Sequence, residues 1–180
     1  DAIQSSIQAG AKSIIVITAG FREVSAKGAE AEQELVELCR SSGVRMVGPN
    51  CLGVLNTDHR MNATFAPSLP RPGRISVISQ SGALCVAILD WAAHQKLGLA
   101  KVISFGNKAD LNEVDFIQAL AEDKQTNVIA GYLDQLGEEN GLGKEWREPI
   151  ADMRRQADRM REIVNDLLEL SRMESSAEEA

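Results

Sequence analysis

The sequence predicts an α/β protein built around parallel β-sheets, with a long α-helix near its C-terminal end. Helix and strand patterns alternate over residues 1–49 and again over residues 74–133. Residues Ser13–Thr18 form a continuous apolar run, which is typical of a strand buried on both faces of a parallel sheet. From about residue 145 to residue 173 an apolar side chain recurs at every third or fourth position, and this spacing predicts the long helix.

The elements of the two series follow from apolar spacing, glycines and capping residues. In the first series we expect a helix that ends near Gly10, a strand over Ser13–Thr18, a helix over about Lys27–Ser41 and a strand over Val44–Val47. In the second we expect strands over Arg74–Ser79, Lys101–Phe105 and Val128–Leu133, with helices over Gly82–Gln95 and from Asp110 to about Ala121. Residues 50–73 concentrate proline and glycine near their end and are expected to form an irregular linker.

The C-terminal segment, residues 135–180, opens with a polar, glycine-rich turn and ends in an acidic tail. Between them, the apolar positions from Ile150 to Leu170 are spaced like the seam of a helical bundle. We therefore expect an amphipathic helix that is able to self-associate.

Composition and charge exclude several classes of function. The 180 residues are 44% hydrophobic and 25% charged, which is typical of a soluble globular protein. The net charge of -7 argues against a nucleic-acid surface, and no apolar run approaches the roughly 20 residues that cross a membrane. Three cysteines without paired spacing predict a reduced, cytoplasmic protein. Because the chain opens at Asp1 within a helical pattern, we expect it to be a piece of a longer protein.

Four loops follow predicted strands, at the positions where open α/β sheets bind ligands. They are Thr18–Phe21, Gly48–Gly53, Ser79–Gly82 and Gly106–Asp110. In the first loop, Gly20 permits a ligand to approach the backbone closely. For three of the loops an ordinary turn is the simpler interpretation, with a buried cysteine in Gly48–Gly53 and a capping aspartate in Gly106–Asp110.

The Ser79–Gly82 loop is the most informative of the four, because it follows an apolar strand and opens a helix. Its small residues leave N–H groups of the helix N-terminus accessible to a phosphate or another anion. A serine N-cap that needs no ligand explains the same residues equally well. The two histidines, His59 and His94, fall outside these loops and are expected at the surface, and no metal-ligand cluster is evident.

Taken in this order, the loops resemble those of the NDP-forming acyl-CoA synthetases, the group that contains succinyl-CoA ligase alpha subunits and acetate–CoA ligases. The matching segments are AGAKSIIVITAGF, GVRMVGPNCLGVLNT, MNATFAP, ISVISQSGALCVAILDWA and SFGNKADLNEVDF, within residues 1–133. The resemblance implies that residues 1–49 are the later half of a CoA-binding, Rossmann-like domain. It also implies that residues 74–134 are the first half of a flavodoxin-like ligase domain.

The same resemblance implies a CoA site in the first two loops. Thr18, Ala19 and Gly20 would border CoA, and Asn50 and Cys51 would lie near its thiol end. The glycine-rich loop that binds the phosphates of CoA in this family has no counterpart in the sequence.

The resemblance further implies a phosphate site. Ser81 and Gly82 would open the helix that holds the phosphate of a phosphohistidine, and Asp134 stands where the family usually has a catalytic glutamate that contacts this histidine. No segment matches the phospho-accepting histidine itself, so we expect this chain to be inactive alone. The resemblance places the NTP or NDP and Mg²⁺ on other domains, with an ATP-grasp domain or subunit as partner and a small carboxylic acid as substrate.

The C-terminal segment resembles a different family. NVIAGYLDQL and WREPIADMRRQADRMREIVNDLLELSRMES are similar to the dimerisation hairpin of sensor histidine kinases. The two resemblances overlap only at about Val128–Leu133, so we infer a chimeric junction there. A native ligase variant with an added helix is the alternative.

Three functional hypotheses follow. The leading one is a fragment of an NDP-forming acyl-CoA synthetase, an enzyme that forms acyl-CoA from an acid, CoA and NTP through a phosphohistidine. The second is a helical dimerisation or signalling module of histidine-kinase type fused to an α/β carrier. The third is a plain CoA-binding or structural domain. Molecular mass in solution distinguishes the second from the others, and CoA titration distinguishes the first from the second.

Overall fold

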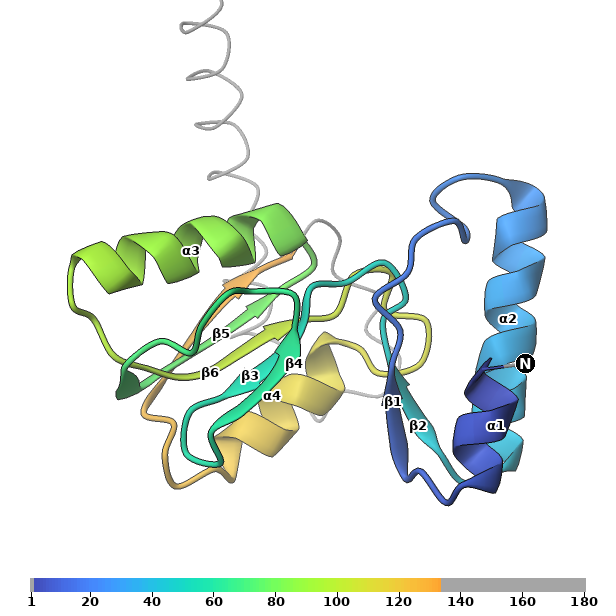
Figure 1. Cartoon of the computed structure of the whole chain (residues 1–180), viewed down its shortest axis with the longest axis horizontal. Helices are drawn as coiled ribbons and strands as arrows, with labels where there is room; N and C mark the ends of the chain where they lie inside the picture. The colour runs from blue at the N-terminus through green and yellow to red at the C-terminus, as the bar shows by residue number, and fades with distance from the viewer. Residues whose placement is uncertain (1, 134–180) are drawn as a thin grey trace, which may run out of the picture. The chain divides into compact units, whose positions relative to one another are not determined.

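The computed structural model describes residues 2–133, and residues 1–132 form one compact unit. Figure 1 shows its elements, which in chain order are α1 (Ala2–Gln8), β1 (Ser13–Ile15), α2 (Ala26–Ser41), β2 (Arg45–Val47), β3 (Gly53–Asn56), β4 (Met61–Thr64), β5 (Pro72–Ser79), α3 (Gly82–His94), β6 (Leu99–Ser104), α4 (Glu113–Ala121) and β7 (Val128–Tyr132). Asp134 and the helix expected over residues 145–173 lie outside the described residues, so both stay predictions.

The first part of the fold is a two-stranded parallel sheet packed against helices. Strands β1 and β2 pair in parallel, with Ile14 opposite Met46. Helix α2 begins where the hydroxyl of Ser25 accepts a hydrogen bond of 3.0 Å from the Gly28 N–H, as expected for a serine N-cap. Cys39 on α2 and Met46 on β2 are fully buried between helix and sheet. This packing holds the carboxyl ends of β1 and β2 side by side.

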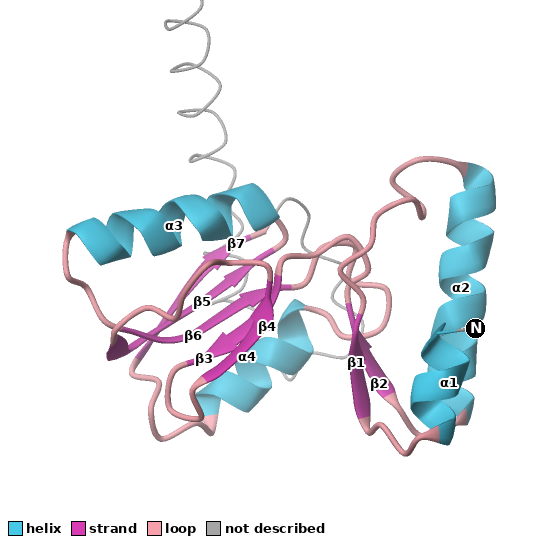
Figure 2. Cartoon of the chain, viewed as in Figure 1, coloured by secondary structure: helices cyan, strands magenta, loops and turns pink. Residues whose placement is uncertain are grey.

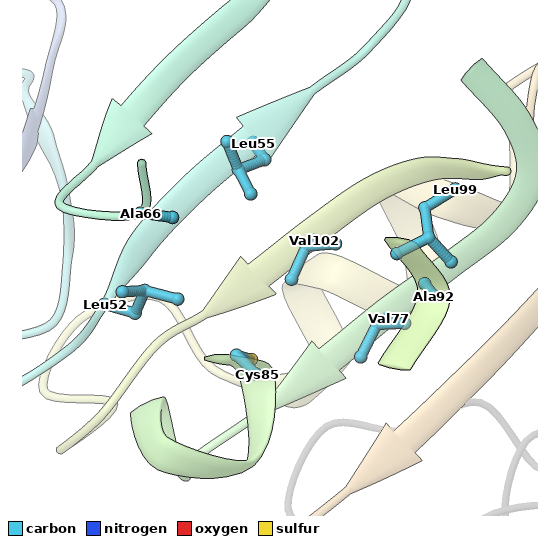
Figure 3. Packing of buried hydrophobic residues seen from close by; sticks show 8 residues of the cluster. All are labelled: Leu52, Leu55, Ala66, Val77, Cys85, Ala92, Leu99 and Val102. Carbon is cyan, nitrogen blue, oxygen red and sulfur yellow. The ribbon is translucent and has the colours of Figure 1, made fainter. Parts of the chain in front are cut away.

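The second part is a five-stranded sheet in the order β4-β3-β6-β5-β7. Strands β5, β6 and β7 are parallel, and helices α3 and α4 cover opposite faces of the sheet (Figure 2). Under α3 lies an apolar core (Figure 3) that consists of Leu52, Leu55, Ala66, Val77, Cys85, Ala92, Leu99 and Val102. The strands and helices expected over residues 74–133 are all present, with ends that differ by at most three residues.

The irregular linker expected over residues 50–73 is wrong, because this stretch contains the hairpin β3–β4. Strand β3 pairs antiparallel with both β4 and β6, so the sheet is mixed rather than wholly parallel. Alternate residues of β3 are buried, and Leu55 is completely so. The prolines at positions 67, 70 and 72 made the whole stretch resemble a linker, although they follow the hairpin.

The strand expected over Ser13–Thr18 is also shorter than predicted. Only Ser13–Ile15 forms β1, and within residues 2–133 this strand pairs with β2 alone. Residues Val16–Thr18 of the apolar run lie outside the strand, and Ile17 is 40% exposed. The expectation of burial on both faces does not hold for this strand.

Candidate ligand site at the strand ends

Three of the four candidate loops lie at one edge of the five-stranded sheet. The parallel strands β5 and β6 end beside each other, with Ser79 opposite Ser104. Strand β3 runs the other way and begins at that edge, so Gly53 also lies opposite Ser104. The loops Ser79–Gly82, Gly106–Asp110 and Gly48–Gly53 are therefore neighbours, as expected for loops at the carboxyl ends of strands.

Hydrogen bonds join the fourth loop, Thr18–Phe21, to this group. The Asn50 N–H donates to the carbonyl oxygen of Thr18 at 3.0 Å. On the other side of the same turn, the N–H groups of Asn107 and Ala109 donate to the carbonyl oxygens of Pro49 and Gly48, at 2.9 and 3.1 Å. The Gly48–Gly53 loop is thus held between the other two, and residues from both halves of the fold meet there.

Close packing of these loops requires glycine at Gly106. Its φ is +52°, and a Cβ there would lie 2.1 Å from the carbonyl oxygen of Asn50. Asn50 has a φ of 56° and follows a cis Gly48–Pro49 peptide bond, and it remains exposed. Thr18, Ala19 and Gly20 are exposed as well. These four residues, of which the first three are predicted to border CoA and Asn50 to lie near its thiol end, are all accessible at the surface.

Cys51 is placed differently from the other predicted CoA residues. It is only 4% exposed, and its thiol donates a hydrogen bond of 3.3 Å to the carbonyl oxygen of Val16. Burial raises the pKa of Cys51 to about 11, so the thiol stays protonated at neutral pH. The expectation of a buried cysteine in this turn is confirmed. Cys51 therefore fixes the Gly48–Gly53 turn through its hydrogen bond to Val16, but its thiol is not accessible as a nucleophile.

The Ser79–Gly82 loop forms the N-terminus of α3 with Ser81 as the N-cap. The Ser81 hydroxyl accepts from the Leu84 N–H at 3.2 Å, and the Ser81 N–H donates to the hydroxyl of the buried Ser79 at 3.0 Å. The N–H groups of Gly82 and Ala83 make no hydrogen bond within the described residues. An anion would therefore find two backbone donors here, because the donor of Ser81 is already used.

The Gly106–Asp110 loop is more than the plain turn with a capping aspartate that the sequence predicts. Asn112 caps α4 instead, and its side chain accepts from the N–H groups of Val114 and Asp115. Asp110 is buried and binds the first part of the fold, where its carboxylate accepts from Nε of Arg40 at 2.8 Å and from Nε of Arg45 at 3.0 Å. The sequence reveals the acidic residue in the loop but gives no signal for its distant partners.

Sequence reasoning also missed a group of polar side chains beside the Thr18–Phe21 loop. Oε1 of Glu23 accepts hydrogen bonds from the N–H groups of Gly20 and Phe21, at 2.6 and 3.1 Å. Nδ2 of Asn107 donates to Oε2 of Glu23 at 2.6 Å and to Oε2 of Glu32 at 2.7 Å. No spacing pattern marks these residues, because Asn107 is 84 positions from Glu23.

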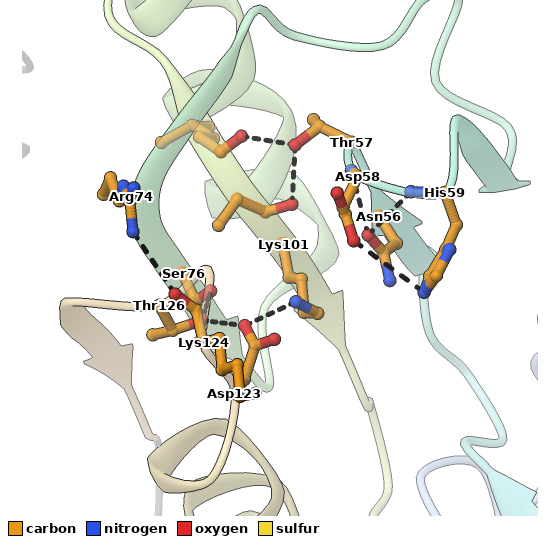
Figure 4. Close-up of polar contacts among 12 residues, drawn as sticks. Asn56, Thr57, Asp58, His59, Arg74, Ser76, Lys101, Asp123, Lys124 and Thr126 are labelled. Atoms are coloured by element: carbon orange, nitrogen blue, oxygen red, sulfur yellow. Dashed lines mark hydrogen bonds and ion pairs between the residues drawn. The ribbon is translucent and has the colours of Figure 1, made fainter.

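Both histidines lie at the surface, as expected. The side chain of His59 is 76% exposed beside Asp58 (Figure 4), and that of His94 is 73% exposed beside Asp90. Among residues 2–133 no group of three or more acidic, cysteine or histidine side chains could hold a metal ion. In the same range, no helix is both long enough and apolar enough to span a membrane.

Comparisons with known proteins identify relatives of this chain. Residues 72–157 match the family described as the succinyl-CoA ligase like flavodoxin domain. Over 127 residues the chain is 50% identical to acetate–CoA ligase [ADP-forming] I of Archaeoglobus fulgidus, which corresponds to 71% of this chain and 18% of that protein. It is 42% identical over 127 residues to acetate–CoA ligase [ADP-forming] I subunit alpha of Pyrococcus furiosus, which corresponds to 71% of this chain and 28% of that subunit.

A solved structure has the same fold. The dinucleotide forming acetyl-coenzyme A synthetase 1 of Ca. Korarchaeum cryptofilum, in complex with phosphate and ADP, superposes with a TM-score of 0.73 and 40% sequence identity. The aligned region covers 77% of this chain and 30% of that one, so the chain spans less than a third of each of these relatives. The family match continues to residue 157, past the expected junction at Val128–Leu133, and the resemblance to histidine kinases gains no support from it.

Proposed function

We propose that this chain, which carries a domain of the NDP-forming acetyl-CoA synthetase and succinyl-CoA ligase alpha type, forms the part of such an enzyme that borders CoA and holds a phosphoryl group. The reaction interconverts an acid, CoA and NTP with acyl-CoA, NDP and phosphate. An ATP-grasp domain or subunit would bind the nucleotide and Mg²⁺, and the acyl substrate would be a small carboxylic acid.

One observation carries the proposal: the loop predicted to border CoA and the loop predicted to hold phosphate belong to the same cluster of strand ends. Thr18–Phe21 is bonded to the Gly48–Gly53 turn. The Leu52 N–H in that turn donates to the hydroxyl of Ser104 at 3.1 Å, and the Phe105 N–H donates to the carbonyl oxygen of Ser79 at 3.0 Å. A thioester and a phosphoryl group handled at these loops would therefore lie near one another.

Each of the two loops has features that suit its expected ligand, CoA at the first loop and a phosphoryl group at the second. Thr18, Ala19 and Gly20 are exposed and have room above the backbone, since no atom lies within 4 Å of the position that a Cβ of Gly20 would take. CoA supplies the thiol that attacks the activated acyl group. At the second loop, the N–H groups of Gly82 and Ala83 at the N-terminus of α3 suit a phosphoryl oxygen. Asp134 would act next to the phosphohistidine, by analogy with the glutamate of the family.

A titration of the 180-residue chain with CoA, followed by calorimetry, tests the CoA site. Ala19→Glu places a negative charge on the exposed loop, and we expect it to weaken binding of the anionic CoA by tenfold or more, whereas Ala121→Glu at the exposed end of α4 should leave the affinity unchanged. If the wild-type chain does not bind CoA, or if both variants bind like wild type, the proposal fails.

A further inference from the structure

The carboxylate of Glu23 lies inside the loop that would border CoA. Its Oε1 accepts the N–H groups of both Gly20 and Phe21, at 2.6 and 3.1 Å. These bonds close the loop on itself and fix the direction of the Thr18–Gly20 backbone. Glu23 is exposed, so an open solvent path leads to this carboxylate.

Asn107 holds the other oxygen of the same carboxylate. Its Nδ2 donates to Oε2 of Glu23 at 2.6 Å and to Oε2 of Glu32 at 2.7 Å, while its Oδ1 accepts from Nδ2 of Asn50 at 3.2 Å. An ionised Glu23 carboxylate only accepts hydrogen bonds, so the Nδ2 group must face Glu23 and the oxygen faces Asn50. Both N–H donors of the Asn107 amide are thereby used in one orientation, and only 7% of the residue is exposed.

The charges of this group favour the same arrangement. Partial burial acts against ionisation of Glu23, but the hydrogen bonds from Asn107 and from the N–H groups of Gly20 and Phe21 lower its pKa to about 2. The second carboxylate, Glu32, is 5% exposed and has Nε of Arg22 at 3.4 Å from its Oε1. At neutral pH one amide therefore bridges an ionised Glu23 and a buried glutamate that is paired with arginine.

We propose that Asn107 is a positioning residue for CoA: through Glu23 it sets the conformation of the Thr18–Phe21 loop, and through its oxygen it orients Asn50. This inference rests on the proposed CoA site. Asn107 follows β6, whose end is bonded to the Ser79–Gly82 loop through Phe105. The side chain of Asn107, from the loop after β6, thus orders the Thr18–Phe21 and Gly48–Gly53 loops, which follow β1 and β2.

Two variants interrupt the contact from opposite sides. Asn107→Ala removes the bridging amide. Glu23→Gln keeps the shape of residue 23 but replaces one of its two acceptor oxygens with an NH2 group. The side chain can then no longer accept from Asn107 and from the Gly20 and Phe21 N–H groups at the same time. We expect each to weaken CoA binding by about 10-fold to 100-fold, the range for losing a hydrogen bond to a charged group. The matched control is Glu30→Gln, which makes the same charge change on the exposed surface of α2.

Hydrogen exchange of backbone amides measures how well the Thr18–Phe21 loop is ordered in the absence of CoA. Exchange at Gly20 and Phe21 should accelerate in Asn107→Ala and in Glu23→Gln, while the amides of β6 should keep their rates. A merely structural role would lower the melting temperature without this selective effect. Ionised Glu23, with its lowered pKa, also contributes to stability, so the melting temperature of each variant is measured. CoA binding is compared at a temperature at which each variant is folded, so that a loss of affinity cannot be ascribed to unfolding.

The possible outcomes separate this inference from the proposed function. Faster loop exchange together with weaker CoA binding in both variants supports the role of Asn107. Unchanged exchange at Gly20 and Phe21, or unchanged CoA affinity in both variants, overturns it. Absence of CoA binding by the wild-type chain overturns the CoA site itself and the positioning role with it, whereas the exchange rates still report whether Asn107 orders the loop.

Discussion

Nε of Arg45, the first residue of β2, donates a hydrogen bond of 3.0 Å to Oδ2 of Asp110, which lies 65 positions later in the loop before α4. The same oxygen accepts the Met46 N–H at 2.8 Å, and the Leu111 N–H donates to the carbonyl oxygen of Met46 at 3.1 Å. Asp110 thus binds both the side chains and the backbone of the first part of the fold. We expect it to be a principal link between the two sheets.

Replacing this carboxylate should destabilise the fold. Asp110→Asn leaves a buried amide facing Arg40, Arg45 and the Met46 N–H, and it should lower the free energy of unfolding by about 1–3 kcal/mol. Urea denaturation followed by circular dichroism measures this loss. Asp90→Asn is the matched control, because the Asp90 side chain is 75% exposed and should contribute little. Equal effects of the two substitutions would contradict the importance of the Asp110 link.

The contribution of Asp110 should also depend on pH. Burial opposes ionisation, but hydrogen bonds from Arg45, the Met46 N–H and Arg40 hold the pKa of Asp110 below its ordinary value of 3.8. A lowered pKa in the folded state means that the ionised group stabilises the fold above the unfolded pKa and that this stabilisation is lost as the pH falls. The difference in unfolding free energy between wild type and Asp110→Asn should therefore be constant from pH 5 to 7 and shrink below about pH 4. A difference that grows in acid would contradict this assignment.

Gly106→Ala should disrupt the contact between two of the candidate loops. The added Cβ would meet the carbonyl oxygen of Asn50 at 2.1 Å, in addition to the strain of a φ of +52°. Gly43→Ala is the matched control, since Gly43 has a φ of +68° and no atom within 4 Å of its would-be Cβ. We expect the control to cost about 1–2 kcal/mol of unfolding free energy and Gly106→Ala clearly more. Thermal denaturation of both variants tests the difference, and a smaller loss for Gly106→Ala would refute the close approach.

Local patterns were sufficient to predict most of the helices and strands. The strands β5 and β6, the helix α2 and the N-cap of α3 lie where the sequence places them, because each depends on neighbouring residues. The hairpin β3–β4 was missed, because its burial depends on pairing with β6, whose partner residues lie 45 to 51 positions later in the chain. Its short strands carry a weaker local signal than the prolines that follow.

The candidate site was predictable only in part. The rule that ligand loops lie at the carboxyl ends of strands selected four loops, and the structure places these loops next to one another. The roles of Thr18, Asn50, Ser81 and the other candidate residues stay predictions. The bonds of Asn107 with Glu23 and of Asp110 with Arg45 could not be predicted, since they join residues that are distant in sequence and belong to no periodic pattern.

The cysteines should be unreactive in the folded protein. All three are free and buried, and burial raises the pKa values of both Cys51 and Cys85 to about 11. At pH 8 their thiols remain protonated, and Cys39 is fully buried as well. Mass spectrometry after treatment with iodoacetamide should find no modification of the native chain and three modified cysteines in urea. Rapid alkylation of native Cys51 would show that the Gly48–Gly53 turn is open.

The 180-residue chain should not form acyl-CoA by itself. His59 lies in the turn between β3 and β4, at the opposite end of β3 from Gly53, and His94 is the last residue of α3, whose N-cap is Ser81. Both histidines therefore lie away from the strand-end loops. With ATP, acetate and CoA, we expect no thioester above the rate of a sample without protein. Steady thioester formation would contradict this, and loss of that activity in a variant with both histidines replaced would identify an unexpected phosphate carrier.

An anion site at the N-terminus of α3 should be separable from the stability of the helix. Sulfate, used as a probe for phosphate, should shift the amide resonances of Gly82 and Ala83 in nuclear magnetic resonance spectra, with chloride at equal ionic strength as the reference. Gly82→Val should remove these shifts, because its branched side chain would cover the backbone donors. The fold should tolerate the change, since the nearest atoms to a Cβ at Gly82 lie 3.6 Å away. Ala87→Val, on the exposed surface of the same helix, adds the same bulk away from the N-terminus and should preserve the response to sulfate. If Gly82→Val keeps the wild-type response, or if sulfate does not shift the wild-type resonances, then Ser81 serves α3 only as an N-cap.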